Sequence, residues 1–414
     1  MAEHRRPVAV IVDSWTCSHF LLDALTAQGV DVVQVKPDPD QAAFGTAMAY
    51  LDTVTGADPA TLADALAAYS PIAVLAGQEP DVPLADALSE RLGLPSNGTA
   101  LSSARRNKYD MAAALAQAGV RCAEQFKSDH VADVVAWAED AGRWPVVVKP
   151  LASAATDNVA ICADAGQVRK AAETILGSEM LWGEPNSEVL VQSYLDGVEY
   201  VVDTVSWEGR RYTCGVWEYR KRQVGVHNLY DCDVLVPADD PRVPVLVDYV
   251  DSALRALDIR YGPTHAEVII TADGPALVEV GARLAGNLSP SFHDLCLGAN
   301  QAALTALAYT RPAEFTERYA GRCYTALHQA WVCNTPTELA GTVRGVHAEV
   351  VAEIEALPTV RELIVKLRPG WRMRPTVDLL SSTLKAFLAA DSTEELQRDY
   401  QRIAELKDRV YQLD

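Results

Sequence analysis

H-A-E-V-I-I-T-A-D-G-P-A-L-V-E-V-G-A-R-L-A-G, residues 265–286, predicts a β-hairpin with one glutamate on each strand. Apolar β-forming residues flank an Asp273-Gly274 turn signal, which is typical of two antiparallel strands. Glu267 and Glu279 are equidistant from Asp273, so a three-residue loop centred there would place them directly opposite each other. Opposed side chains lie about 5 Å apart, and like charges at that distance are destabilising.

A cation between the two carboxylates would explain why the chain carries both. Two carboxylates together with substrate phosphates are the usual ligands of Mg²⁺. The alternative is a solvated pair on an exposed face of the hairpin, and this segment alone does not decide between the two.

The composition is that of a soluble globular protein. The 414 residues are 49% hydrophobic and 22% charged, and a chain of this length predicts two or three domains. The formal net charge of −20 argues against nucleic acid or an anionic membrane surface as a partner. No apolar run approaches a membrane span, and V-A-V-I-V at 8–12 is too short for a signal peptide, so we expect a cytoplasmic protein.

The N-terminal part predicts a parallel sheet. Strand-like runs at 7–13, 31–35 and 72–76 alternate with helical stretches, as in β-α-β units. A dinucleotide-binding domain is the first alternative, but the turn after the first strand, S-W-T-C-S-H, lacks the glycines that let backbone amides reach a pyrophosphate. We therefore expect this layer to be a scaffold or a wall for substrate.

Further along the chain, Lys149 closes the apolar strand V-V-V-K-P and is followed by a loop of small residues. A lysine at a buried strand end is costly unless it meets an anion, although it can also snorkel into solvent. Strand-like runs dominate from 188 to 236, a helix is expected at 242–257, and a charged amphipathic helix at 393–412 ends the chain. The expected fold class is α/β, with α+β character in the part that carries the glutamates.

Five motifs then follow in a recognisable order. They are N-K-Y-D at 107–110, V-V-V-K-P at 146–150, V-Q-S-Y-L-D-G-V-E-Y at 191–200, H-A-E at 265–267 and V-E-V-G-A-R-L-A-G at 278–286. With these motifs, the chain resembles the ATP-grasp superfamily, and within it the L-amino-acid ligases of the bacilysin-synthetase type, over roughly residues 1–330.

The resemblance implies three domains, with a nucleotide bound between the last two. Residues 1–106 would form a Rossmann-like pre-ATP-grasp domain, and 107–194 a small lid subdomain. Residues 195–414 would form the large subdomain and a C-terminal extension.

The resemblance also implies a nucleotide and metal site. Lys108 and Lys149 would contact the phosphates, and Glu267 and Glu279 would bind Mg²⁺, with Mn²⁺ as a substitute. Arg283, together with Lys108, would stabilise the transferred phosphoryl group of ATP. Other nucleotide contacts would come from the phosphate loop and from the hinge between two strands: Ser153, Thr156, Gln192, Ser193, Leu195 and Glu199.

A further set of residues is expected around the substrates: Arg220, His227, Tyr230, Asp231, His265, Gly286 and Asn287. From the run R-K-R at 220–222, at least one cation is expected to face the phosphates or a substrate carboxylate. His265 or Asp231 is a candidate acceptor for the proton of the attacking amine.

Two positions depart from the family pattern. The phosphate loop has alanines at 154 and 155 in place of its usual glycines. Gly281 stands where many members have an asparagine, which removes one oxygen ligand and leaves open how many metal ions are bound.

The function implied is an ADP-forming ligase that joins a carboxylate to an amine through an acyl phosphate. Its products would be amides or peptides of an amino acid, in specialised-metabolite biosynthesis. The alternatives are another ATP-grasp carboxylase or ribonucleotide-synthesis enzyme, and a silent nucleotide-binding module. The partners are small molecules, and the family suggests a homodimer. The identities of the two substrates and the role of residues 321–414 stay open.

Overall fold

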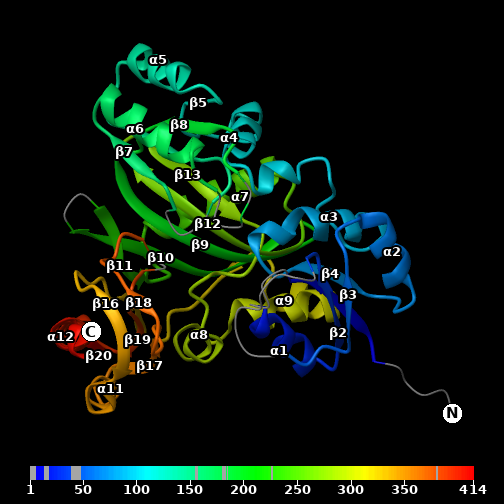
Figure 1. The fold of residues 1–414 in the computed structure, drawn as a ribbon. Helices are drawn as coiled ribbons and strands as arrows, with labels where there is room; N and C mark the ends of the chain where they lie inside the picture. Colours follow the sequence, from blue (N-terminus) through cyan, green and yellow to red (C-terminus); the bar gives the residue numbers. More distant parts are fainter. Residues whose placement is uncertain are drawn as a thin grey trace.

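The computed structural model describes residues 6–13, 18–38, 48–153, 157–179, 183, 185–224, 227–378 and 381–414. Its first part is a four-stranded parallel sheet in the order β3-β2-β1-β4 (Figure 1). The strands are β1 Val8–Val12, β2 Asp31–Lys36, β3 Asp52–Thr55 and β4 Ala73–Ala76. The helices around them are α1 His19–Ala27, η1 Glu79–Asp81, α2 Pro59–Ala67 and α3 Val82–Arg91.

The buried strands of this sheet explain why it is parallel. All five residues of β1 are apolar and buried, as expected for a strand that is covered by helices on both faces. The three predicted strands are therefore confirmed. The edge strand β3 was not predicted, because D-T-V-T is mostly exposed and lacks an apolar run.

A second, antiparallel sheet forms a small unit at the top of Figure 1, in the order β5-β8-β6-β7. Its strands are β5 Gln125–Ser128, β6 Val146–Pro150, β7 Ala160–Cys162 and β8 Val189–Ser193. Helices α5 Val131–Ala141 and α6 Ala165–Leu176 pack on it through a core of buried valines, alanines and isoleucine.

The largest sheet has nine strands, in the order β13-β12-β9-β10-β11-β15-β19-β17, with β14 beside β10. Its bounds are β9 Gly197–Trp207, β10 Arg210–Val224, β11 His227–Leu235, β12 Gly262–Thr271, β13 Gly274–Gly281, β14 Arg322–Cys323, β15 Gln329–Asn334, β17 Val360–Val365 and β19 Leu384–Ala390. The helices associated with it are α7 Arg242–Ala256, α8 Pro290–Leu297, α9 Gln301–Thr310 and α10 Pro312–Arg318.

Residues 329–414 have two structural roles. They add β15, β19 and β17 to the large sheet, and they form a separate three-stranded sheet in the order β18-β16-β20. The remaining elements are β16 Gly341–Val346, α11 Ala348–Glu355, β18 Arg372–Met373, α12 Thr393–Leu406, η3 Lys407–Arg409 and β20 Tyr411–Leu413. The charged helix predicted at 393–412 thus ends as an α-helix at Leu406, and the 3-10 helix η3 and the strand β20 follow it. No helix in the described ranges is long and apolar enough to cross a membrane.

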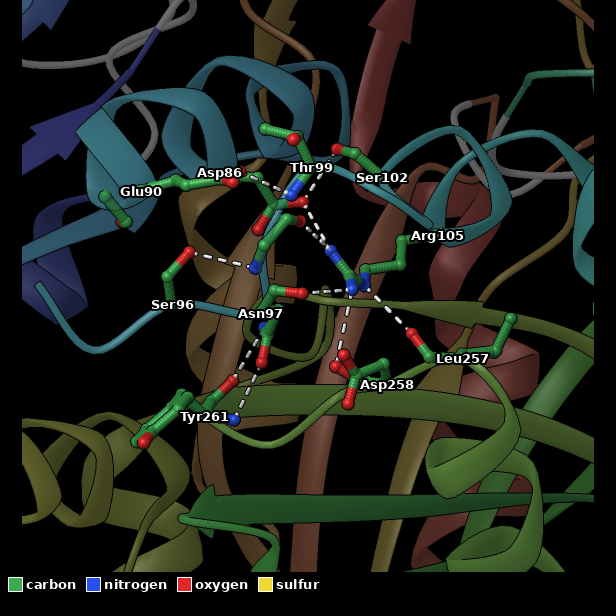
Figure 2. Close-up of polar contacts among 12 residues, drawn as sticks. Asp86, Glu90, Ser96, Asn97, Thr99, Ser102, Arg105, Leu257, Asp258 and Tyr261 are labelled. Atoms are coloured by element: carbon green, nitrogen blue, oxygen red, sulfur yellow. Dashed lines mark hydrogen bonds and ion pairs between the residues drawn. The ribbon is translucent and has the colours of Figure 1, made fainter. Parts of the chain in front are cut away.

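A buried arginine joins the N-terminal domain to the body that carries the large sheet (Figure 2). Arg105, in the short helix η2 Ser103–Arg105, is fully buried and lies 2.8 Å from Asp86 on α3. Its other N–H groups donate to backbone carbonyls on both sides, including Leu257 at 3.1 Å and Gly98 at 2.7 Å. The Asn97 side chain adds bonds to the backbone of Tyr261.

This joint is followed directly by the helix that begins with Lys108. Asn107 caps α4 Lys108–Gln117, because its side-chain oxygen accepts hydrogen bonds from the backbone N–H groups of Tyr109 and Asp110. Met111 and Leu115 of α4 pack in the core of the large sheet. The joint therefore fixes where the first candidate lysine enters the site.

Candidate active site

The glutamate hairpin has the predicted pairing but a different turn. Glu267 on β12 lies opposite Glu279 on β13, as expected. The turn has two residues rather than three, because Thr271 pairs directly with Gly274. An extra residue on β13, Val278, restores the spacing as a β-bulge, so that both carboxylates share one face.

Lys108 and Lys149 reach this pair from two other elements. Lys108 Nζ lies 2.5 Å from Glu279 Oε2 and donates to the carbonyl oxygen of Ser153 at 2.8 Å. Lys149, on β6, is 5% exposed, and its ammonium has no hydrogen bond or ion pair within the described ranges. Burial and the charge of Lys108 lower the pKa of Lys149 to about 8. An anion at this point would stabilise the Lys149 ammonium.

The two glutamates differ in their pKa values although they are paired. Burial and the charge of Glu279 raise the pKa of Glu267 well above its ordinary value. Burial also acts to raise the pKa of Glu279, but the charge and hydrogen bond of Lys108 outweigh it, so that the pKa of Glu279 is lowered. A divalent cation would remove the repulsion and allow both carboxylates to ionise.

Glu199 lies on the same face, two strands along from β13. It is buried, and Lys221 Nζ lies 2.5 Å from one carboxylate oxygen while the Tyr230 hydroxyl donates to the other at 2.9 Å. The Lys221 ammonium also lies 4.6 Å from the centre of the Tyr230 ring. Glu199, which is predicted as a nucleotide contact, is therefore held in place by β10 and β11.

His265 is buried beside the metal pair, and both of its ring nitrogens have partners. Nδ1 lies 2.7 Å from Asp203 Oδ1, and Nε2 lies 3.2 Å from the Tyr219 hydroxyl and 3.8 Å from Glu267 Oε1. Because a carboxylate only accepts, Nδ1 carries the proton and Nε2 accepts from Tyr219 in the neutral ring. His265 thus orients its neighbours, and a role as proton acceptor would require Tyr219 to move.

Arg283 lies between the hairpin and the N-terminal domain. Its guanidinium is 3.3 Å from Glu79, which follows β4 of the parallel sheet, and donates to the carbonyl of Leu284 at 2.9 Å. A Cβ built on Gly281 would lie 3.2 Å from the guanidinium carbon of Arg283. The glycine therefore leaves room for Arg283, and Glu79 makes the parallel sheet a wall of the site.

Residues 142–291 match the model of the ATP-grasp domain family. Over 98% of its length, the chain is 33% identical to dapdiamide A synthase of Enterobacter agglomerans, of which the match covers 96%. The chain belongs to the ATP-grasp family. The expected enzyme class, an ATP-dependent ligase that forms C–N bonds, is confirmed with it.

Solved structures of ATP-grasp enzymes have the same fold. The L-amino acid ligase from Bacillus licheniformis superposes with a TM-score of 0.79 over all of both chains, at 19% identity. The biotin carboxylase domain of a Hydrogenobacter thermophilus 2-oxoglutarate carboxylase, solved with MgADP, gives 0.66 over 99% of this chain and 91% of its own, at 12% identity. These likenesses establish the ATP-grasp fold and its N-terminal parallel sheet.

Half of the predicted site residues are brought together on one face of the large sheet, next to the small one. The group that clusters there comprises Lys108, Lys149, Ser153, Glu199, Tyr230, His265, Glu267, Glu279 and Arg283. Thr156 lies outside the described residues, and so does the side chain of His227.

Arg220 and Asp231 are not brought to this group. Lys221 faces Glu199, whereas Arg220, one position away on β10, lies over the Trp331 ring at 5.3 Å, on the other face of the sheet. Asp231 binds Arg222 at 2.9 Å and lies against Tyr400 of α12, also on that other face. Of the three cations at 220–222, Lys221 is therefore the one that faces the site.

The hinge residues at the end of β8 are placed differently from one another. Gln192 is buried and donates to the Gln125 side chain at 3.1 Å. The backbone N–H of Ser193 donates to the carbonyl oxygen of Glu124 at 2.9 Å, so this N–H is not available to the adenine base of a nucleotide. Leu195 lies in the connection to β9 and is half-buried, where its backbone groups are in no strand.

The loop after β13 contributes Asn287. Its Nδ2 donates to Asp233 Oδ2 at 2.9 Å, and its Oδ1 is buried without a hydrogen bond in the described structure. Burial raises the pKa of Asp233 to about 6, although Asn287 and Lys385 oppose the shift. Gly286, in contrast, is exposed, and no atom lies within 4 Å of the position of a Cβ there.

Sequence reasoning missed five residues of the site: Glu79, Asp203, Tyr219, Lys221 in its present role, and Asp233. Alternation along β9 was a usable signal for Asp203. Val201 pairs with Glu267, and Asp203 lies two positions further along the strand, so its side chain points to the face that carries the glutamates. On β11 the unpaired residue Asp231 interrupts the alternation, so the pattern of the sequence does not predict which side chains face the site.

The donor set fits Mg²⁺ only together with nucleotide phosphates. The two opposed glutamates are oxygen ligands of the kind Mg²⁺ prefers, and the charge repulsion between them favours a cation. Within the described ranges, no cluster of three or more His, Cys, Asp or Glu residues could hold a metal by itself. The remaining ligands would have to come from phosphate or water.

Proposed function

We propose that this protein is an ADP-forming ligase that joins the carboxylate of an amino-acid-like substrate to an amine through an acyl phosphate. The observation that carries the proposal is the convergence of two lysines and two opposed glutamates from four elements at one buried point. The similarity to dapdiamide A synthase over nearly the whole chain supports an amide-forming role in specialised metabolism.

The nucleotide would bind between the lid subdomain, residues 107–194, and the large subdomain, residues 195–414. Lys149 would bind phosphate oxygens, since it is a buried ammonium without a hydrogen bond or ion pair to any residue that the structure describes. Mg²⁺, when bound at Glu267 and Glu279, would neutralise charge on the phosphates. Lys108 and Arg283 would offset the charge that develops on the transferred phosphoryl group.

The substrate carboxylate would then attack the γ-phosphate of ATP, and an amine would displace phosphate from the acyl phosphate. The attacking amine has to lose a proton in this step. Asp233, with its pKa raised to about 6 and its place beside His265, is better situated to accept that proton than Asp231. We expect the enzyme to work in the cytoplasm, and a homodimer stays a prediction.

ADP release measured with each amino acid alone and in pairs tests this function. The proposal expects ADP formation that depends on both a carboxylate and an amine, with an amide product in the mass spectrum. Nucleotide hydrolysis without any dependence on an amine, across amino-acid pairs and simple amines, would refute the ligase.

A further inference from the structure

The C-terminal extension continues the face of the large sheet that carries the glutamates. Tyr219, which bonds His265, lies opposite Asp233 in the register of β10 and β11. Asp233 in turn lies opposite Val332 on β15, and two positions further along β15 Asn334 lies opposite Lys385 on β19. Because side chains two apart on a strand share a face, Asn334 and Lys385 lie on the side of Asp233.

Several polar groups on this stretch have no hydrogen-bond partner among the residues that the structure describes. Asn334 is 3% exposed, and its Oδ1 makes no hydrogen bond in the described structure. The Oδ1 of Asn287, beside Asp233, is likewise buried and unpaired. The ammonium of Lys385 makes no hydrogen bond and no ion pair within 4.0 Å among the residues with described side chains, although β19 is largely buried. Buried polar groups are costly unless they are hydrogen-bonded, so this stretch is suited to a polar ligand.

The charged groups along this stretch are two lysines and two carboxylates. Asp233 lies on the His265 side of Lys385, and Glu362, which accepts a hydrogen bond from Ser289 Oγ at 2.5 Å, lies opposite Phe387, two positions along β19 from Lys385. Burial lowers the pKa of Lys385, while Asp233 and Glu362 oppose the shift. The Lys366 ammonium donates to Ser382 at 2.7 Å, so Lys385 is the lysine of this stretch that an anionic ligand would meet.

We propose that Lys385 and Asn334 bind the free carboxylate of the amine-donating substrate, whose amine lies at Asp233 and the Oδ1 of Asn287. The amine-donating substrate is then an α-amino acid and not a simple amine. Its amine faces His265 and the glutamate pair, where the acyl phosphate would form, and its carboxylate points away along β19. The proposal rests on the proposed ligase function, and it gives the C-terminal extension a role in the choice of substrate.

The test uses three nucleophiles with one acyl-phosphate donor. The amine substrate is the amino acid that gives the fastest ADP release, and it is compared with its α-carboxamide and with hydroxylamine, neither of which carries a carboxylate. Lys385→Met is expected to raise the KM of the amino acid roughly 10- to 100-fold, because a buried charge partner is lost. The rate of hydroxamate formation with hydroxylamine and the KM of ATP are expected to stay unchanged.

The controls separate this idea from a structural effect and from failure of the proposed function. Lys407→Met removes a lysine of the same C-terminal segment that pairs with Asp408 at 2.8 Å, and it should leave the KM of the amino acid as it is. Lys385→Arg keeps the charge and should retain most of the affinity. An unchanged KM in Lys385→Met, or an equal loss with hydroxylamine, overturns the carboxylate subsite. Absence of hydroxamate and ADP in the wild-type protein would instead refute the ligase function itself.

Discussion

Two glutamates that face each other in a buried site are stable only with cations around them. Lys108 binds Glu279 directly, and the charge of Lys149 acts on the same group. Even so, burial and repulsion raise the pKa of Glu267. The sequence predicts this pair from its spacing about a turn. It does not reveal that Glu79, Asp203 and Tyr219 surround it, because those residues are brought in by strands that are distant in the chain.

Glu279→Gln tests the role of the pair at this scale. The change removes one of two carboxylates and the ion pair with Lys108, so we expect turnover to fall by about 10³-fold or more. ADP release at saturating ATP and Mg²⁺ measures it. Glu188→Gln, which alters a lid carboxylate 2.8 Å from Lys127, is the matched control and should keep its activity. Full turnover in Glu279→Gln would refute the metal assignment.

At the scale of elements, the glutamate hairpin shows which part of a strand pattern is readable. The alternation and the turn signal predict the two strands and their facing carboxylates. The bulge at Val278 has no local signal, since its residue is an ordinary β-former, and it compensates for a turn one residue shorter than expected. The bulge opposite Arg220 and Lys221 has another consequence, because its extra residue is Asp231 on β11, and Tyr230 rather than Asp231 therefore faces the site.

Deleting Val278 provides a test of the hairpin. The deletion removes only the extra residue: Leu277 stays opposite Val268, and Glu279 therefore stays opposite Glu267 in a regular ladder. We expect this variant to keep its ADP release. Inserting an alanine between Val278 and Glu279 should instead move Glu279 opposite Ala266, on the other face of the sheet, because a shift by one residue exchanges the two faces. We expect the insertion to abolish ADP release while the far-ultraviolet circular dichroism stays close to that of the wild-type protein, and an insertion variant with wild-type turnover would contradict the need for opposed carboxylates.

At the scale of the whole molecule, the site is assembled from the parallel sheet, the lid and the large sheet together. The order of the motifs predicts the ATP-grasp fold and the N-terminal sheet. It does not predict that β15, β19 and β17 join the large sheet, because these pairings are long-range and their strands are short apolar runs without a motif. The joint around Arg105 is also unpredictable, since it depends on backbone carbonyls from two distant segments.

Arg105→Met tests how firmly this joint holds the N-terminal domain. The substitution leaves the buried Asp86 carboxylate with the Ser102 hydroxyl but without its charged partner, and we expect it to lower the free energy of unfolding by about 3–5 kcal/mol. Urea denaturation measures the change. Arg143→Met, which breaks an exposed pair with Glu124, should alter stability by less than about 1 kcal/mol. Similar midpoints for the two variants would show that the buried joint contributes little.

The central claim is that this ATP-grasp ligase activates a carboxylate as an acyl phosphate at the site of Glu267, Glu279 and Lys149. The most direct measurement supplies the carboxylate substrate with ¹⁸O in both carboxylate oxygens and analyses the released phosphate by mass spectrometry. Attack of a carboxylate oxygen on the γ-phosphate predicts one ¹⁸O atom in each inorganic phosphate, formed together with ADP. Phosphate without ¹⁸O, or ¹⁸O found in AMP, would contradict the account.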